Sequence, residues 1–315
     1  MTIKLTGFAD EAGPTLAEQI RAHRQLGWDS IEIRMVGERP NDRNFTELDD
    51  AAYRQCAREL AGAGMGVSCF GSPIANWARK ITGDFAQDVA SLRRAAPRMR
   101  ELGVKLIRVM SYPNDNLSTA DWLKEAVRRL KELARIAEGE GVVLAHENCS
   151  GYGGESPEML GELLAAIPSP ALQVAFDTGN PPAHSGKNQD CVEGRTWAFY
   201  QVSRPRIVHV HIKDAKPGPE GKTVFCFPGE GAGEVRRVVR DLAAWGYDGY
   251  LSIEPHIKSV VHLGKSGEPA GAYDTYIEYG RRMAAILAEV GKEAKGIKGA
   301  RGAKPARGPR GRARG

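Results

Sequence analysis

Four side chains of types that bind divalent cations lie in the second half of this 315-residue sequence, each at the end of a run rich in apolar residues. They are Glu147, Asp177, His211 and Glu254. Three carboxylates and one imidazole form a mixed set of oxygen and nitrogen donors, which suits Mn²⁺, Mg²⁺ or Co²⁺ better than a structural zinc bound by thiolates. We therefore predict one bound divalent metal ion, with Mn²⁺ favoured and Mg²⁺, Co²⁺ or Zn²⁺ as alternatives.

The alternation of residue types predicts that these four side chains point into the same space. In the segment 207–213, His209, His211 and Lys213 share one face of an extended strand, and three aliphatic residues share the other. The aliphatic face must pack against helices, so the polar face points to the interior. The same alternation turns the three carboxylates inward, namely Glu147, Asp177 and Glu254. Burying four ionisable groups together without a cation is costly, which favours a shared metal ion over separate structural roles.

A divalent ion beside carboxylates suggests chemistry at the carbon next to a carbonyl group. The ion stabilises the negative charge that develops when an enediolate forms, and two carboxylates on opposite faces of the carbon act as base and acid. Return of the proton to the other face gives epimerisation, and return to the adjacent carbon gives aldose–ketose isomerisation. Loss of a β-substituent gives elimination. The ligand set alone leaves these three reactions open.

Eight β-rich segments alternate with amphipathic helical patterns along the chain. The helical spacing is clearest in 15–26 and in 119–138. The predicted strands are 3–8, 30–34, 66–70, 104–110, 142–147, 172–177, 207–213 and 250–254. Strict alternation implies right-handed βαβ units and a parallel sheet, either closed into a barrel or open and doubly wound.

The positions of the polar residues favour the closed form. No GxGxxG pattern follows the first predicted strand, and the candidate ligands lie at the carboxyl ends of several different strands. A (β/α)₈ barrel builds its active site at that end from many strands. We therefore predict an α/β protein with a single (β/α)₈ TIM barrel as a catalytic domain over residues 1–291.

The basic character of the chain belongs to its end. Residues 292–315 hold nine Lys or Arg and one Glu, so they contribute +8 to a formal net charge of +5, and the other 291 residues carry −3. This segment has almost no large apolar residue beyond Ile297, so we predict a disordered tail. A salt-sensitive contact with nucleic acid is one interpretation of the tail, and a solubilising extension is the favoured one.

Composition and cysteine use suggest the cellular setting. Hydrophobic residues make up 42% and charged residues 26%, as in globular proteins, and no apolar run is long enough to span a membrane. The start of the chain lacks the pattern of a secretory signal. The five cysteines are scattered and form no CxxC pair, which is typical of a reduced protein. We expect a cytoplasmic protein without membrane contact.

The segments HEN, FDTGN, HVHIKD, FPGEG and SIEPH, in this order, resemble the xylose isomerase-like TIM barrel family of sugar phosphate isomerases and epimerases. That family also includes keto-sugar isomerases and inosose dehydratases. The resemblance runs from GFADE near the start to SIEPH. It implies that the metal ligands are Glu147, Asp177, His211 and Glu254. It also implies that Glu147 and Glu254 are the catalytic acid and base.

Two differences from the family pattern limit the activities that the resemblance implies. Asn180 stands where the similar ketohexose 3-epimerases have a substrate-holding histidine, which disfavours a free ketohexose as the substrate. The apurinic endonucleases of the same superfamily use three zinc ions and extra histidines on the third, fourth and sixth strands. The segments SCFGSP, RVMSYP and FDTGN supply none of these histidines, so we expect one metal ion and no phosphodiester cleavage.

Four further residues are candidates for substrate binding: Arg34, His146, Asn180 and His209. Arg34 either binds a hydroxyl or phosphate group or forms an ion pair with Glu32. His209 either contacts the substrate or orients a ligand carboxylate. His146 points away from the barrel centre if its strand stays regular, and turns toward the substrate if the strand end bends.

The sequence therefore predicts a divalent-metal-dependent isomerase or epimerase of a keto sugar or sugar derivative, acting through an enediolate. The alternative enzyme is a metal-dependent lyase or dehydratase that performs β-elimination on a keto sugar, a keto-inositol or an oxidised glycoside. The alternative of another class is a non-catalytic barrel that binds a sugar or a partner. The expected partners are a small sugar substrate and either identical subunits or a partner subunit that completes the pocket.

Overall fold

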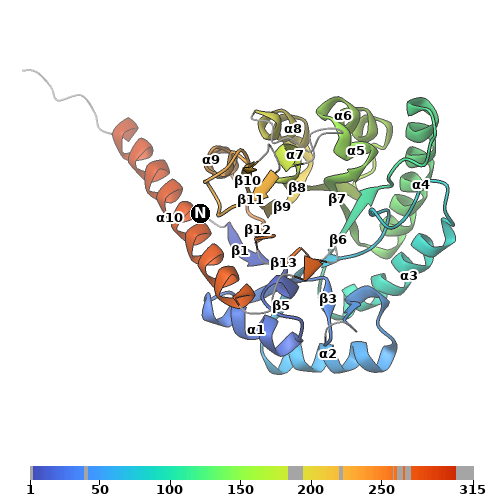
Figure 1. The fold of residues 1–315 in the computed structure, drawn as a ribbon, viewed down its shortest axis with the longest axis horizontal. Coiled ribbons are helices and arrows are strands. Elements are labelled where there is room, and N and C mark those ends of the chain that lie inside the picture. Colours follow the sequence, from blue (N-terminus) through green and yellow to red (C-terminus); the bar gives the residue numbers. More distant parts are fainter. Residues whose placement is uncertain are drawn as a thin grey trace, which may run out of the picture.

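Eight parallel strands form a ring that is surrounded by helices in the computed structural model (Figure 1). The structure describes residues 3–38, 42–183, 194–219, 223–257, 259–260, 265–266 and 271–302. The strands of the ring are β1 (Lys4–Gly7), β2 (Ser30–Ile33), β5 (Gly66–Gly71), β6 (Leu106–Ser111), β7 (Val143–Gly151), β8 (Leu172–Asp177), β9 (Ile207–Ile212) and β12 (Tyr250–Ile253). Each lies within or overlaps one of the eight predicted segments.

The ring of strands is closed between its first and second members. The strands pair in the order β1, β12, β9, β8, β7, β6, β5 and β2. Phe8 and Glu32 then form an isolated parallel bridge, and the Thr6 hydroxyl donates a 2.8 Å hydrogen bond to the Ser30 carbonyl oxygen. The predicted (β/α)₈ TIM barrel is therefore confirmed.

Ten α-helices are described, and the longest of those with clear end signals is α4. The Ser118 side chain accepts a hydrogen bond from the Asp121 amide at its start, and Gly141 ends it in the left-handed region with φ 70°. The helices are α1 (Leu16–Gln25), α2 (Asp50–Gly62), α3 (Ala86–Glu101), α4 (Thr119–Glu140), α5 (Tyr152–Glu155), α6 (Pro157–Ala166), α7 (Asn180–Ala183), α8 (Arg195–Ser203), α9 (Val235–Trp245) and α10 (Ala272–Gly302).

Three short β-hairpins lie in the described loops. They are formed by β3 (Met35–Val36) with β4 (Arg43–Asn44), β10 (Ala215–Pro217) with β11 (Thr223–Phe225), and β13 (Ser259–Val260) with β14 (Lys265–Ser266). Single turns of 3₁₀-helix are η1 (Ala9–Glu11), η2 (Phe45–Glu47) and η4 (Arg204–Arg206). Several of these pieces follow ring strands and so shape the loops above the barrel.

The alternation within β9 divides its side chains between two environments. Val210 and Ile212 are fully buried in an apolar cluster that includes Val238 and Leu242 of α9. Burial of each such aliphatic side chain contributes about 1.5–3 kcal/mol to stability. Because these aliphatic side chains point outward, the alternating histidines of the strand point into the barrel interior.

Helix α10 packs against α9 and α1 and runs along the outside of the barrel (Figure 1). It continues to Gly302, so the expected boundary at residue 291 falls inside this helix. The residues from 292 to 302 include Lys, Glu and Ala, which favour helix formation. Residues 303–315 lie outside the described part of the chain. Among the described helices, none has the length and apolar composition that a membrane span requires.

Candidate metal centre

The four predicted metal ligands meet at the carboxyl-terminal end of the barrel. One donor atom from each of Glu147, Asp177, His211 and Glu254 lies within 4.8 Å of the donor atoms of the other three, and all four residues are buried. Strands β7, β8 and β9 carry the first three, and Glu254 follows β12 directly. Parallel strands end at the same side of the barrel, which explains how side chains far apart in sequence converge.

The imidazole of His211 presents one nitrogen atom to the centre of this cluster. Its Nδ1 atom lies 3.4 Å from Glu147 Oε1 and 3.9 Å from Asp177 Oδ2. This nitrogen is buried and has no hydrogen-bond partner among the described residues. A buried nitrogen without a partner, facing carboxylate oxygens, is the arrangement that a bound cation completes.

Asp177 is fixed by backbone groups on both sides. Its Oδ1 atom accepts hydrogen bonds of 2.7 and 2.6 Å from the amides of Gly179 and Asn180. The side chain of Asn148 binds the main chain of Asp177 twice, accepting from its amide at 2.7 Å and donating to its carbonyl oxygen at 3.0 Å. These contacts hold Asp177 Oδ1 in place and leave Oδ2 directed at the cluster.

The charges of the cluster are unbalanced without a metal ion. Burial, aided by the carboxylates of Glu254 and Glu147, raises the pKa of Asp177 to about 7 despite the opposing charge of Lys213. Burial disfavours a charge on His211, yet the carboxylates of Glu32 and Glu147 raise its pKa well above 6.5. Burial and the neighbouring carboxylates thus both disfavour a further negative charge at the centre, and a divalent cation offsets this.

Lys213 supplies positive charge beside two of the candidate ligands. Its Nζ atom lies 2.7 Å from Glu254 Oε2 and 3.2 Å from Asp177 Oδ2. Burial opposes the charge of this ammonium, but the surrounding carboxylates raise the pKa of Lys213 above its usual value. Lys213 therefore stays charged within the cluster.

Two arginines each hold one oxygen of a candidate catalytic carboxylate. Arg108 Nη1 donates to Glu147 Oε2 at 2.9 Å, and Arg34 Nη1 donates to Glu254 Oε1 at 2.9 Å. Burial opposes ionisation of Glu254, but neighbouring cations, including Lys213 and Arg34, hold its pKa well below 4.5. In each of the two carboxylates, the other oxygen atom therefore faces the cluster.

The predicted alternative of an ion pair between Arg34 and Glu32 is wrong. Arg34 Nε lies 3.0 Å from Asp10 Oδ2, and its Nη2 atom lies 3.5 Å from Glu11 Oε1. Glu32 lies within β2 and faces His209 and His211, whereas Arg34 follows the end of β2 and reaches Asp10 and Glu11 after β1.

Two further candidate residues, Asn180 and His209, lie beside the metal ligands. Asn180 Nδ2 donates a 3.0 Å hydrogen bond to Glu147 Oε1. His209 is buried below the cluster, with Nε2 at 2.8 Å from Glu32 Oε2. Asn180 is therefore close to the reacting centre, and His209 lies beneath it.

His146 lies away from the cluster, on the outer face of β7. The strand pairs regularly there, with His146 opposite Val174 and Glu147 opposite Ala175. A Cβ atom placed on Gly153 would lie 2.6 Å from the ring carbon Cε1 of His146, so the ring packs against α5. Burial lowers the pKa of His146 to about 4. Because the pairing with β8 is regular at His146, its ring does not join the residues at the cluster.

A cavity of about 270 Å³ opens above the cluster. Its lining combines an aromatic side chain with charged groups: Trp77, Arg34, Arg108, Glu147, Lys213 and Glu254. Trp77 is 49% exposed and forms part of the wall of the cavity. A polar floor and an aromatic wall are typical of sites for small polar ligands.

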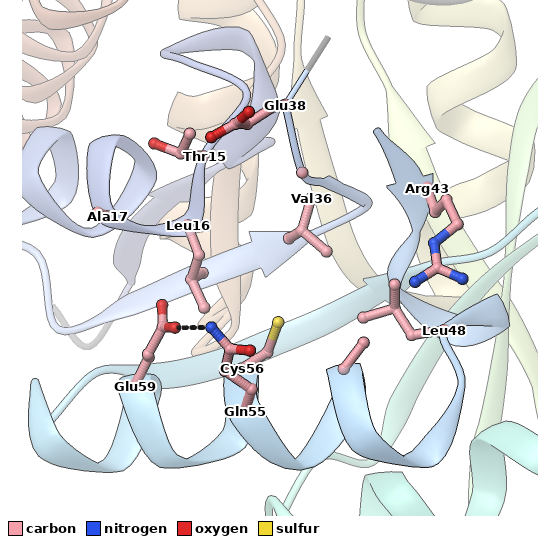
Figure 2. A pocket seen from close by; sticks show the side chains of 12 residues that line it. Thr15, Leu16, Ala17, Val36, Glu38, Arg43, Leu48, Gln55, Cys56 and Glu59 are labelled. Atoms are coloured by element: carbon pink, nitrogen blue, oxygen red, sulfur yellow. Dashed lines mark hydrogen bonds between the residues drawn. The ribbon is translucent and has the colours of Figure 1, made fainter. Parts of the chain in front are cut away.

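A second cavity, of about 300 Å³, lies outside the barrel between α1 and α2 (Figure 2). Its lining includes Leu16, Val36 and Leu48, and Gln55 donates a 3.0 Å hydrogen bond to Glu59. None of the four candidate ligands lines this cavity. The candidate metal site is therefore associated with the cavity inside the barrel and not with this second cavity.

Several residues at the site were missed by the sequence reasoning. Asp10 and Glu11 follow β1 and bind Arg34, and His256 lies two residues after Glu254. His256 Nδ1 lies 2.8 Å from Glu11 Oε1. The position of Asp10 and Glu11 just past a strand end is the signal that identifies them, because the same rule identified the metal ligands.

A family model described as the xylose isomerase-like TIM barrel matches residues 20–283 of the chain. An inosose dehydratase from Bacillus licheniformis is 25% identical over 185 residues, 54% of this chain and 57% of the relative. A 2-epi-5-epi-valiolone 7-phosphate 2-epimerase from Actinoplanes is 29% identical over 152 residues, 48% of this chain and 50% of the relative. The chain thus matches about half the length of these curated relatives.

Solved structures share the fold at low identity. The IOLI protein with a binding zinc atom has a TM-score of 0.69 and 18% identity, covering 91% of this chain and 99% of that one. A xylose isomerase-like TIM barrel protein from Mycobacterium smegmatis in complex with magnesium has a TM-score of 0.63 and 15% identity, covering 91% and 97%. At these identities the likeness establishes the architecture.

Proposed function

The chain belongs to the xylose isomerase-like TIM barrel family, and we propose that it is a divalent-metal-dependent isomerase or epimerase of a keto sugar or sugar derivative. The observation that carries this proposal is the convergence of three carboxylates and one imidazole within 4.8 Å at the catalytic end of the barrel. Relatives named as an epimerase and as dehydratases support enzymatic function.

Glu147, Asp177, His211 and Glu254 would hold the metal ion. A divalent ion at such a site polarises a substrate carbonyl group and neutralises negative charge on its oxygen. The oxygen-rich donors are compatible with Mn²⁺, the favoured ion, and with Mg²⁺ or Co²⁺, while Zn²⁺ accepts the same mixture of oxygen and nitrogen. Structural neighbours with magnesium and with zinc support a metal ion of this class.

Glu147 and Glu254 are proposed as the base and acid. Arg108 and Arg34 each bind one oxygen of these carboxylates, which orients the other oxygen toward the cavity. One carboxylate removes the proton next to the substrate carbonyl, and the resulting enediolate is protonated by the other from the opposite face or at the adjacent carbon. The first outcome is epimerisation and the second is isomerisation.

The remaining polar groups favour a small polyhydroxylated substrate. The exposed ring of Trp77 offers an apolar wall for a sugar ring, and Arg34 offers donors to hydroxyl groups at the same cavity. Asn180 is proposed to hold Glu147 through their 3.0 Å hydrogen bond and to contact the substrate. His209 is proposed to act from below the site rather than on the substrate.

A lyase is the second candidate, because the Bacillus licheniformis relative is named as an inosose dehydratase. The same base would remove the same proton, and a β-hydroxyl group would then leave. Turnover in deuterium oxide with a panel of keto sugars and keto-inositols distinguishes the two reactions. An isomer that carries deuterium supports the isomerase or epimerase, whereas an unsaturated product that is lighter by one water supports the lyase.

The proposal is tested by Glu147→Gln and Glu254→Gln in protein purified with Mn²⁺. Because each amide removes a proton-transfer group while preserving shape, we expect turnover to fall about 10²- to 10⁴-fold in each variant. Glu59→Gln on α2 is the matched control and should keep normal turnover. Normal turnover in both site variants contradicts the proposal, and absence of stoichiometric divalent metal from wild-type protein favours a non-catalytic binding barrel.

A further inference from the structure

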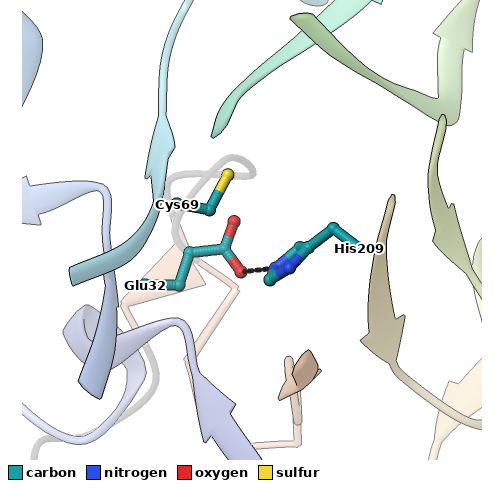
Figure 3. A group of neighbouring side chains, drawn as sticks. All are labelled: Glu32, Cys69 and His209. Carbon is teal, nitrogen blue, oxygen red and sulfur yellow. Dashed lines mark hydrogen bonds and ion pairs between the residues drawn. The ribbon is translucent and has the colours of Figure 1, made fainter. Parts of the chain in front are cut away.

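Glu32 lies on β2 directly beneath the candidate metal centre and is fully buried. Figure 3 shows its carboxylate between His209 and Cys69, deep inside the ring of strands. Its Oε2 atom accepts a 2.5 Å hydrogen bond from the Ser252 hydroxyl and lies 2.8 Å from His209 Nε2. Its Oε1 atom lies 3.2 Å from His211 Nε2. Both oxygens are therefore engaged, and one of them faces a candidate metal ligand.

The contact with Glu32 determines which nitrogen of His211 carries hydrogen. A carboxylate that receives three such contacts acts as an acceptor, so the Nε2 atom of His211 donates to it. A metal ion bound at this centre would displace the second proton, and the neutral imidazole would then have its lone pair on Nδ1. That nitrogen lies 3.4 Å from Glu147 Oε1, on the side of the metal centre.

We infer that Glu32 is a positioning residue that holds His211 in the Nε2–H tautomer and orients its Nδ1 lone pair toward the metal ion. This inference rests on the metal centre of the proposed function. Ser252 on β12 and His209 on β9 contact Oε2 of Glu32 and hold its side chain in place. Glu32 on β2 in turn contacts the candidate ligand His211 through Oε1. Carboxylates that bind the second nitrogen of a ligand histidine raise metal affinity by 10- to 100-fold.

The same residues do not form a second metal site. One donor atom from each of Glu32, Cys69 and His209 lies within 4.8 Å of the other two. The contacts with Ser252, His209 and His211 already occupy both oxygens of Glu32, and none of the three residues lines either cavity described above. The cluster is therefore a support beneath the metal centre.

The test measures Mn²⁺ binding to metal-free protein by titration calorimetry, for wild type and for Glu32→Gln. The amide keeps the size of the side chain but is a weaker acceptor for His211, so we expect a 10- to 100-fold weaker Mn²⁺ affinity. Glu59→Gln on α2 is the matched control, since it makes the same change at the cavity outside the barrel, and it should bind Mn²⁺ with wild-type affinity. Circular dichroism and thermal unfolding of the metal-free proteins verify that each variant is folded.

A second measurement does not depend on how well the variant folds. ¹⁵N NMR of the histidine rings in wild-type protein loaded with diamagnetic Zn²⁺, assigned with His211→Gln, should show His211 protonated at Nε2 and not at Nδ1. Protonation at Nδ1, or wild-type Mn²⁺ affinity in folded Glu32→Gln, overturns the inference and leaves the proposed function intact. Failure of wild-type protein to bind any divalent ion overturns both.

Discussion

Gly179 constrains the candidate metal centre at the scale of a single residue. It lies between Asp177 and Asn180, and its amide donates a hydrogen bond to Asp177 Oδ1. A Cβ atom at this position would lie 2.5 Å from Lys213 Cγ and 2.7 Å from the Lys213 carbonyl carbon. The close approach of Lys213 therefore excludes a side chain, which explains the glycine within the segment FDTGN.

Replacing Gly179 by alanine should disturb both the fold and the metal centre. The extra methyl group must displace the backbone of Lys213, so we expect a loss of about 1–3 kcal/mol in the free energy of unfolding and weaker Mn²⁺ binding. Urea unfolding and titration calorimetry measure the two effects. Gly161→Ala in α6 is the control, because a Cβ atom at that position would lie 3.7 Å from Val202 Cγ1, an ordinary van der Waals distance. An equal response of the two variants contradicts this account.

At the scale of elements, loops above the barrel are organised by buried polar residues at strand ends. Asp214 follows β9 and accepts backbone hydrogen bonds from Ala215, Gly229, Gly231 and Gly233 at 2.8–3.0 Å. This single carboxylate shapes the loop that contains the segment FPGEGAGE. Glu230 of the same segment forms an ion pair with Arg282 of α10 at 2.6 Å.

Helices α1 and α10 are joined by a buried histidine. His23 Nδ1 lies 2.9 Å from the Gln19 carbonyl oxygen, and its Nε2 atom lies 3.2 Å from the Tyr276 hydroxyl. Burial lowers the pKa of His23 from 6.5 to about 4. Between these two values the unfolded chain binds a proton at this residue and the folded protein does not, so stability falls as the pH falls.

The His23→Gln variant should therefore depend less on pH than the wild type. Between pH 7.5 and pH 5, we expect the wild type to lose about 2 kcal/mol more of its free energy of unfolding than the variant does. Urea unfolding at the two pH values measures the difference. Equal losses in both proteins, or an NMR titration of His23 with a midpoint near 6.5, contradict the buried neutral state.

At the scale of the whole molecule, the metal ion and the fold are thermodynamically linked. The four candidate ligands come from β7, β8, β9 and the end of β12, which are separate in the unfolded chain. A cation that binds only the assembled centre stabilises the folded state by mass action. It also offsets the burial and the repulsion by Glu254 and Glu147 that together raise the pKa of Asp177.

Addition of Mn²⁺ should raise the thermal midpoint of the metal-free protein. At 100 times the dissociation constant the stabilisation is about 2.7 kcal/mol, which for a protein of this size is a shift of roughly 4 °C. Differential scanning calorimetry with and without EDTA measures the shift, and KCl at equal ionic strength is the control. No shift beyond the KCl control contradicts a metal centre built from these strands.

Local sequence patterns were sufficient for the barrel and for the four clustered donors. Strand alternation has a period of two, so the inward direction of His211 could be deduced from its immediate neighbours. Regular pairing of β7 with β8 at His146 likewise turns its ring outward, although the sequence left that choice open. The side of a strand to which a residue points follows from its neighbours in the sequence, so it can be predicted without knowledge of the rest of the fold.

Contacts across the barrel depend on tertiary structure. Glu32 and His211 are 179 residues apart, and the partners of Arg34 come from the segments that follow β1 and β12. Which side chains share a layer inside a closed ring is set by the stagger between all eight strands, a quantity that no single segment encodes. The sequence thus determined the type of fold and the inward-facing donors, and closure of the barrel decided what supports each of them.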